Sequence, residues 1–171
     1  VSECAVGNSK DVLYLGSADL RKGGGLKVFI EECWPKVVRA HPDARLLMAG
    51  RGTESYSRPE VRVEGIGYQA EESSFLSRGH IFVNPQLIGA GIKIKSLVAM
   101  MRGKALVTTS TGAEGIPGTN GEHFLVADEW NDFAKLLIEL LDDFSRTKTI
   151  GMHARRFVLE QYGQDRLNSS V

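Results

Sequence analysis

The segment IGAGIKIKSLVAMMRG, residues 88–103, combines residue types that can bind an anion. Gly89 and Gly91 open it, Lys93 and Lys95 follow, and an apolar helical pattern completes it. The first turn of a helix presents unpaired backbone N–H groups and about half a positive charge, and glycines let a phosphate approach the backbone. We therefore expect this helix start to bind a phosphate group. The alternative is an ordinary glycine-opened helix whose lysines are solvated.

Composition excludes several classes of protein. The 171 residues include 21 basic and 21 acidic side chains, which argues against a nucleic-acid-binding protein because such proteins usually carry a basic excess. No apolar run approaches the roughly 18 residues that span a bilayer. Cys4 and Cys33 have no metal or redox spacing, which favours a reducing, cytoplasmic setting. The four histidines lack the spacing of metal ligands, and the sequence contains no Asp-x-Asp motif. The sequence therefore predicts no metal site.

Short apolar runs alternate with helical patterns along the chain. Apolar runs bounded by glycine, proline or polar residues predict buried strands, and apolar residues recurring every three to four positions predict helices. Pro35 is expected to kink or restart the first helix. The expected strands are 12–16, 44–50, 61–65, 80–85, 104–110 and 123–127, and the expected helices are 26–41, 69–78, the second half of 88–103, 130–141 and 150–162.

This alternation predicts one Rossmann-like α/β domain, a doubly wound parallel sheet with a core of about residues 11–163. Ligands of such folds bind beyond the carboxyl ends of the strands. The loops at that edge are 16–25, 50–58, 65–70, 85–93 and 109–122, and most of them are rich in glycine, serine or threonine.

Two long stretches resemble a known family. Residues 12–52 are similar to the start of the carboxyl-terminal domain of GT-B glycosyltransferases in the large retaining family 4, and residues 61–116 are similar to the rest of its nucleotide-sugar site. The Gly89-Ala90-Gly91 turn with Lys93 and Lys95 resembles a subgroup concerned with bacterial exopolysaccharide. The resemblance implies one half of a two-domain architecture. Because the chain starts at a valine, we expect the amino-terminal, acceptor-binding domain to be absent from it.

The resemblance also implies an activity. The chain would hold a UDP-, GDP- or ADP-linked sugar for metal-independent, retaining transfer to a glycan or a lipid-linked acceptor, with no cofactor beyond this donor. Lys93 and Lys95 would stabilise the departing diphosphate. The catalytic base would belong to the absent amino-terminal domain, which is also the expected partner and the part that associates peripherally with a membrane. The isolated chain would then bind its donor weakly and transfer nothing.

Further donor-binding positions follow from matching the family's motifs. The first loop would contact the diphosphate, and the turn before Tyr68 would frame the base, although Tyr68 and its turn could equally cover the sheet end. Lys22, with Arg21 beside it, stands where the family has a basic residue, whereas Ser17 replaces an arginine. The implied positions are Gly16, Ser17, Lys22, Gly65, Ile66, Gly67, Gly89, Ala90, Gly91, Ile92, Lys93, Lys95 and Val98.

Two positions depart from the family. Ala90 and Val98 stand where the family has paired glutamates, the second of which accepts hydrogen bonds from the ribose. Each lost charged hydrogen bond is worth roughly 1.5–3 kcal/mol. Val98 also falls on the apolar stripe of its helix with Ile94, Leu97 and Met101, as a core residue would. A degenerate GT-B domain that serves as a scaffold or partner-binding module is therefore the alternative function.

The remaining polar loop residues have simpler interpretations. Thr109, Ser110, Thr111 and Gly112 follow a strand and could line a sugar or phosphate pocket, but ordinary turn chemistry explains them as well. Glu114 lies in the same loop. A dinucleotide-dependent oxidoreductase would need G-x-G-x-x-G directly after the first strand, and the GSADLRKGGG found there lacks that spacing.

Overall fold

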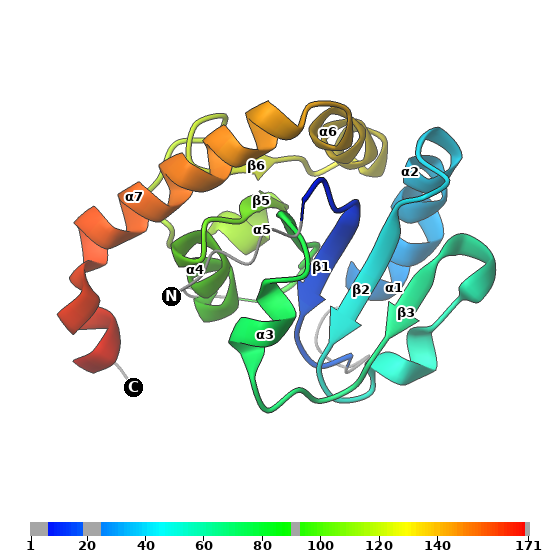
Figure 1. The fold of residues 1–171 in the computed structure, drawn as a ribbon, viewed down its shortest axis with the longest axis horizontal. Helices are drawn as coiled ribbons and strands as arrows, with labels where there is room; N and C mark the ends of the chain where they lie inside the picture. The colour runs from blue at the N-terminus through cyan, green and yellow to red at the C-terminus, as the bar shows by residue number, and fades with distance from the viewer. Residues whose placement is uncertain (1–6, 19–24, 90–92, 170–171) are drawn as a thin grey trace.

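Six parallel strands form one sheet in the computed structural model, which describes residues 7–18, 25–89 and 93–169. The strand order is β3-β2-β1-β4-β5-β6, so the direction of winding reverses between β1 and β4 (Figure 1). This order confirms the predicted doubly wound sheet, and each of the six predicted strands is present. The strands are β1 Asp11–Leu15, β2 Arg45–Ala49, β3 Val63–Gly65, β4 Ile81–Asn84, β5 Ala105–Thr108 and β6 Leu125–Val126.

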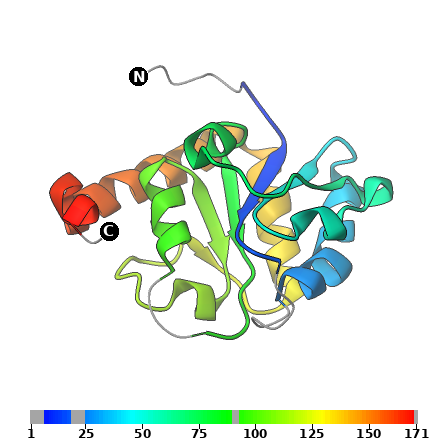
Figure 2. The same cartoon turned by 90° about the horizontal axis from the view of Figure 1, so that it is seen from below.

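Helices cover both faces of the sheet (Figure 2). One face carries α1, α2 and α6, and the other carries α3, α4 and α7, as the two apolar clusters show. The helical segments are α1 Gly25–Val28, η1 Phe29–Cys33, α2 Trp34–Ala40, η2 Thr53–Tyr56, η3 Pro59–Val61, α3 Glu72–Leu76, α4 Ile94–Met101, α5 Ser110–Ala113, α6 Trp130–Asp142 and α7 Phe144–Ser169. The short segment η2 lies in a stretch that the sequence predicted as a loop. The segments η3 and α5 each overlap a predicted strand by one residue, at Val61 and Ser110, because β3 and β5 are shorter than predicted.

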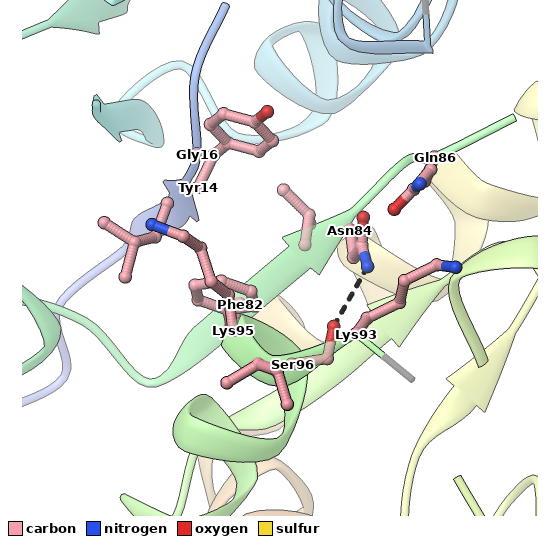
Figure 3. A pocket seen from close by; sticks show the side chains of 11 residues that line it. Tyr14, Gly16, Phe82, Asn84, Gln86, Lys93, Lys95 and Ser96 are labelled. Atoms are coloured by element: carbon pink, nitrogen blue, oxygen red, sulfur yellow. Dashed lines mark hydrogen bonds between the residues drawn. The ribbon is translucent and has the colours of Figure 1, made fainter. Parts of the chain in front are cut away.

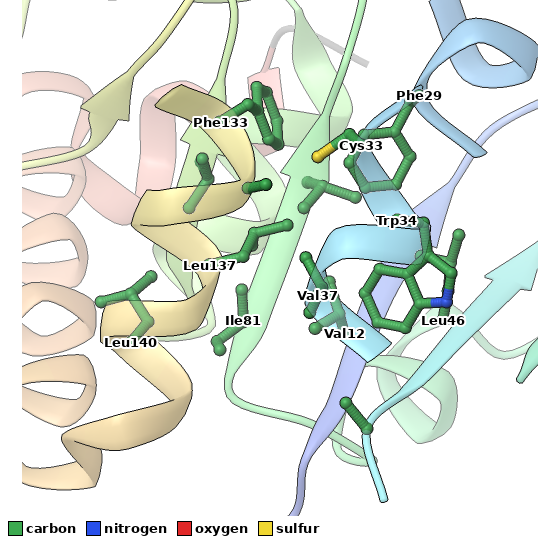
Figure 4. Packing of buried hydrophobic residues seen from close by; sticks show 14 of the residues in the cluster. Val12, Phe29, Cys33, Trp34, Val37, Leu46, Ile81, Phe133, Leu137 and Leu140 are labelled. Atoms are coloured by element: carbon green, nitrogen blue, oxygen red, sulfur yellow. The ribbon is translucent and has the colours of Figure 1, made fainter. Parts of the chain in front are cut away.

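Side chains that alternate between the two faces of the sheet divide the apolar core into two clusters. Val12 of β1 pairs with Leu46 of β2 and belongs to the first apolar cluster, whereas the next pair, Leu13 and Leu47, belongs to the second. Successive strand residues point to opposite faces, so a strand buried on both sides needs apolar residues throughout. Figure 4 shows the first cluster, where helices α2 and α6 pack together over the sheet.

Pro35 restarts the first helix, as the sequence predicted. The five residues before Trp34 form a π-helical turn, and the Trp34 N–H donates to the carbonyl of Phe29. Because proline has no N–H to continue the helical ladder, the backbone widens by one residue ahead of it. Trp34 is thereby buried, and its indole N–H donates to the Val61 carbonyl at 2.7 Å.

The last helix begins six residues earlier than predicted. The sequence placed its start at Ile150, but α7 begins at Phe144, directly after α6 ends. Asp143 explains the difference: its carboxylate accepts the Arg146 N–H at 3.0 Å and so satisfies an unpaired donor of the first turn. Asp142, the last residue of α6, is 62% exposed and lies 2.8 Å from His41 Nε2. Within the described residues, no helix has the length and apolarity to span a bilayer.

Candidate functional site

A pocket of about 220 Å³ opens between the carboxyl ends of β1 and β4 (Figure 3). This is the point where the strand order reverses, and crevices that bind ligands form there in doubly wound sheets. Three segments supply its walls: the end of β1, the end of β4 with the residues after it, and the first turn of α4. The lining residues are Tyr14, Leu15, Gly16, Phe82, Val83, Asn84, Gln86, Lys93, Ile94, Lys95 and Ser96.

Helix α4 points its amino-terminus at the pocket. Lys93 has an extended backbone, and its carbonyl accepts the N–H groups of Ser96 and Leu97 at 3.1 and 3.2 Å. The predicted apolar stripe is wrong at Ile94, which is 64% exposed. The helix buries Ser96, Leu97 and Met100, whereas Ile94 lines the pocket.

The two lysines bracket the pocket. Lys95 extends toward Gly16, the residue after β1 (Figure 3). Its Nζ lies 3.6 Å from a carboxylate oxygen of Glu72. Lys93 extends the other way, toward Gln86, and a methyl group added at Gly89 would lie 3.7 Å from Lys93 Nζ. The structure therefore brings both predicted cations to one pocket, at opposite sides of it.

A hydrogen-bonded pair forms the polar floor of the pocket. The Asn84 side-chain amide donates to the buried Ser96 hydroxyl at 3.0 Å, and the Asn84 carbonyl accepts the Thr108 hydroxyl at 2.9 Å. Sequence reasoning missed this pair. Two sequence features could have indicated the pair: a polar residue, Asn84, at the carboxyl end of a strand, and a serine, Ser96, within an otherwise apolar helix.

The end of β1 forms the opposite wall. Gly16 donates to the Ala49 carbonyl at 2.9 Å, and a side chain at Gly16 would lie 2.8 Å from the Tyr14 hydroxyl. Burial, with a smaller contribution from Tyr56, raises the pKa of Tyr14 to about 12. The phenol is therefore neutral at physiological pH and donates to the Ser17 carbonyl at 3.4 Å.

Several predicted residues cannot be placed. Arg21 and Lys22 of the first loop, and Ala90, Gly91 and Ile92 of the loop before α4, lie outside the described residues. Their predicted roles at a diphosphate stay predictions.

The turn predicted to frame the base is held by close backbone packing. The Gly67 N–H donates to the buried Thr53 hydroxyl at 3.0 Å, and that hydroxyl donates to the Gly50 carbonyl at 2.8 Å. A side chain at Gly65 would lie 1.9 Å from the Thr53 carbonyl oxygen. Sequence reasoning missed Thr53. Close packing around Thr53 therefore explains the glycines at positions 50, 65 and 67.

This glycine turn lies along the same sheet edge, outside the pocket lining. Ile66 is partly buried against the second apolar cluster, and Tyr68 is 70% exposed. Val98 is also partly buried against that cluster and does not line the pocket. The structure thus agrees with the interpretation of Val98 as a packing residue.

The hydroxyl groups after β5 hold the neighbouring loop. Thr109 donates to the Gln86 carbonyl and accepts the Gly112 N–H at 3.1 Å. Thr111 donates to the Leu87 carbonyl at 3.4 Å. These are turn and capping interactions, and they position the backbone that leads into the pocket.

Ser110 is hydrogen-bonded to Asp128, two residues after β6. Its N–H donates to Asp128 at 2.8 Å, and its hydroxyl donates to the same carboxylate. These two hydrogen bonds hold the pKa of Asp128 below its usual range. Glu114, in the same loop, is exposed and ends α5.

The histidines have structural partners away from the pocket lining. His41 contacts Asp142, His80 Nε2 lies 2.8 Å from the Gly7 carbonyl oxygen, and His123 stacks on Phe157. Burial lowers the pKa of His80. His153 lies on α7. Across the described ranges, no group of three or more histidine, cysteine or acidic side chains is placed to hold a metal ion.

Residues 9–143 match the family model described as glycosyl transferases group 1. The chain is also 30% identical, over 173 aligned positions, to an uncharacterized 44.6 kDa protein in the cps region of Klebsiella pneumoniae. That alignment covers 94% of this chain and 45% of the relative, so the chain spans less than half of the relative's length.

Solved structures share the fold. The structure of HepE from Anabaena in complex with UDP and glucose superposes with a TM-score of 0.75 at 17% identity, over 98% of this chain and 50% of that one. The carboxyl-terminal domain of LpcC, a glycosyl transferase group 1 family protein from Francisella tularensis, superposes with a TM-score of 0.72 at 17% identity, over 90% of this chain and 86% of that one.

Proposed function

The chain belongs to the glycosyl transferases group 1 family, and from this premise we propose that it is the donor-binding half of a metal-independent, retaining GT-B glycosyltransferase of family 4. The observation that carries the proposal is the pocket at the switch point, with Lys93 and Lys95 on either side of the α4 amino-terminus. A helix amino-terminus with added lysines suits the diphosphate of a nucleotide-sugar.

The size of the pocket agrees with a site that is shared between two domains. Small-molecule sites usually enclose about 300–1,000 Å³, and this pocket has about 220 Å³. It would enclose part of a nucleotide-sugar, such as the diphosphate. An amino-terminal domain would then cover the sugar and carry the acceptor, and the chain alone would bind the donor without transferring the sugar.

The chemistry assigned to this chain is leaving-group stabilisation. When the bond between the sugar and the diphosphate breaks, negative charge develops on the diphosphate oxygens. The ammonium groups of Lys93 and Lys95, together with the α4 amino-terminus, would stabilise that charge without a metal. The nucleotide-sugar is then the only small molecule the site requires, and the base or other groups acting on the acceptor belong to the other domain.

The relatives support a narrower assignment. HepE was solved with UDP and glucose, which favours a UDP-linked sugar as the donor. The Klebsiella relative lies in a cps region, which favours polysaccharide synthesis and fits the exopolysaccharide subgroup expected from the glycine-lysine turn. A cytoplasmic location, and a glycan or lipid-linked acceptor bound by the other domain, are parts of the same proposal.

Calorimetric titration with UDP, GDP and ADP tests the proposal. We expect saturable binding of one nucleotide, and a loss of about ten- to a hundredfold in affinity for the double variant Lys93→Ala, Lys95→Ala. The matched control is Lys135→Ala, Lys148→Ala, which removes two exposed lysines from α6 and α7. Equal binding by both double variants would contradict the assignment of the pocket. No binding to the folded wild-type chain at millimolar nucleotide would contradict the proposed function itself.

Val98 favours a second candidate, a degenerate domain that serves as a scaffold. Its partly buried valine packs against the second apolar cluster and offers no acceptor to a ribose. If the wild-type chain binds no nucleotide, Val98→Glu is the next variant. Nucleotide binding by this variant would identify the valine as the reason that the wild-type chain does not bind. If the variant does not bind either, the scaffold function is the better explanation.

A further inference from the structure

The described pocket lining lacks a carboxylate. Its polar side chains are a phenol, two amides, a hydroxyl and two ammonium groups. A nucleotide also presents the two ribose hydroxyls, which donate hydrogen bonds, and nucleotide sites commonly receive them on an aspartate or glutamate. Val98, one helical turn beyond Lys95, cannot accept a hydrogen bond. If the pocket binds a nucleotide as proposed, a carboxylate that accepts from its ribose has to come from beyond this described lining.

Among the described residues, Glu72 places a carboxylate beside a residue of the pocket lining. It is the first residue of α3, which covers the same face of the sheet as α4. Its Oε1 lies 3.6 Å from Nζ of Lys95, a lining residue, and both side chains are about half exposed, at 47% and 50%. An ion pair between such exposed groups contributes little to stability, roughly 0–1 kcal/mol. Both groups therefore remain able to contact a ligand.

We propose that Glu72 accepts the ribose hydroxyls of the bound nucleotide while Lys95 contacts its diphosphate. The ion pair holds the anion-binding and diol-binding groups side by side before the ligand arrives, which lowers the cost of ordering them on binding. Glu72 thereby takes the role that a glutamate at the position of Val98 would have. This inference rests on the proposed function and adds a specificity-determining residue to it.

A simpler role for Glu72 predicts the opposite result. If the carboxylate only neutralises Lys95, it competes with the diphosphate, and its removal should tighten nucleotide binding. If it binds the ribose, its removal should erase the preference for a nucleotide that carries ribose hydroxyls. The two roles are therefore separable by comparing two ligands on one variant.

The experiment measures the affinities of the 171-residue chain for UDP and for dideoxyuridine diphosphate, which lacks both ribose hydroxyls. We expect the wild-type chain to prefer UDP by about tenfold or more, because hydrogen bonds to a charged group are worth roughly 1.5–3 kcal/mol. Glu72→Gln should reduce this ratio to about twofold. The control is Glu71→Gln, which neutralises the adjacent exposed carboxylate, whose partner is the Ser74 hydroxyl at 3.1 Å; this variant should keep the wild-type ratio.

Each outcome decides one of the two claims. A Glu72→Gln variant that keeps the full preference for UDP, or that binds both ligands more tightly without changing their ratio, would overturn the role of Glu72 and leave the proposed function standing. A wild-type chain that binds both ligands equally would do the same. A wild-type chain that binds neither of them, and neither GDP nor ADP, would overturn the proposed function, and the role of Glu72 with it.

Discussion

Two glycine-rich turns at the same edge of the sheet are built in opposite ways. The glycine turn, formed by Gly50, Gly65 and Gly67 around Thr53, is closed by backbone contacts and a buried hydroxyl. The pocket segment, residues 84–89 and 93–96, instead presents lysine and amide side chains to an opening. In sequence the two look alike, since both combine glycine with polar residues after a strand. Glycine accompanies close backbone approach in one and a pocket in the other, so glycine content alone does not distinguish them.

The glycine turn and the pocket segment differ in whether their polar groups are buried. In the glycine turn the polar group is a fully buried threonine whose partners are backbone atoms. In the pocket segment the two lysines remain partly or largely exposed. We expect substitutions in the glycine turn to change the free energy of unfolding, and those at the pocket lysines to change ligand binding.

The largest effect should come from Gly50→Ala. Gly50 has a φ of +134°, and its added methyl group would lie 1.9 Å from the Gly16 carbonyl oxygen. Backbone strain and overpacking together should lower the free energy of unfolding by about 3–5 kcal/mol. Urea denaturation measures this. The control is Gly121→Ala, which has a φ of +91° with no heavy atom within 4 Å of the new methyl group, and it should cost only about 1 kcal/mol. Equal losses would show that strain alone, without the clash, governs both sites.

Thr53→Val should have the next largest effect. It keeps the shape of the side chain but leaves the Gly67 N–H without its acceptor. An unsatisfied buried donor costs about 1–3 kcal/mol. Thr53→Ser retains the hydroxyl and should recover most of that loss in the same denaturation experiment. A valine variant as stable as the wild type would show that Gly67 finds another acceptor.

Asp128→Asn should have a smaller effect that depends on pH. Hydrogen bonds from Ser110 lower the pKa of the Asp128 carboxyl in the folded chain, so folding favours the carboxylate. Its contribution is present above the unfolded pKa of about 3.9 and is lost as the pH falls through the lower folded value. For this exposed group we expect a loss below about 1 kcal/mol at pH 7, shrinking toward pH 3. A difference in urea midpoint that stays constant across this range would contradict the prediction.

The smallest change in stability should come from the double variant Lys93→Ala, Lys95→Ala. Exposed surface substitutions usually change the free energy of unfolding by no more than about 0.5 kcal/mol. The same variant should lose the nucleotide affinity described above. A large loss of stability here would mean that the pocket segment resembles the glycine turn after all, and would remove the contrast between them.

Local patterns predicted the elements that position the pocket. The apolar runs placed all six strands, and the glycine-lysine segment placed the start of α4 beside the sheet edge. The predictions failed where a residue's surroundings come from other elements. Ile94 fits a helical stripe but is exposed at the pocket, and α7 starts at Phe144, where Asp143 accepts an N–H of its first turn.

By itself, the sequence determined the doubly wound sheet, because alternating apolar periods allow few other arrangements. It also determined that two lysines stand at a helix start, since that depends only on neighbours along the chain. Only the tertiary structure decided that Asn84 meets Ser96, that Thr53 meets Gly67, and that Glu72 reaches Lys95. The partners in each of these pairs come from different segments, and they meet only after the crossovers set the register and the helices dock on the sheet.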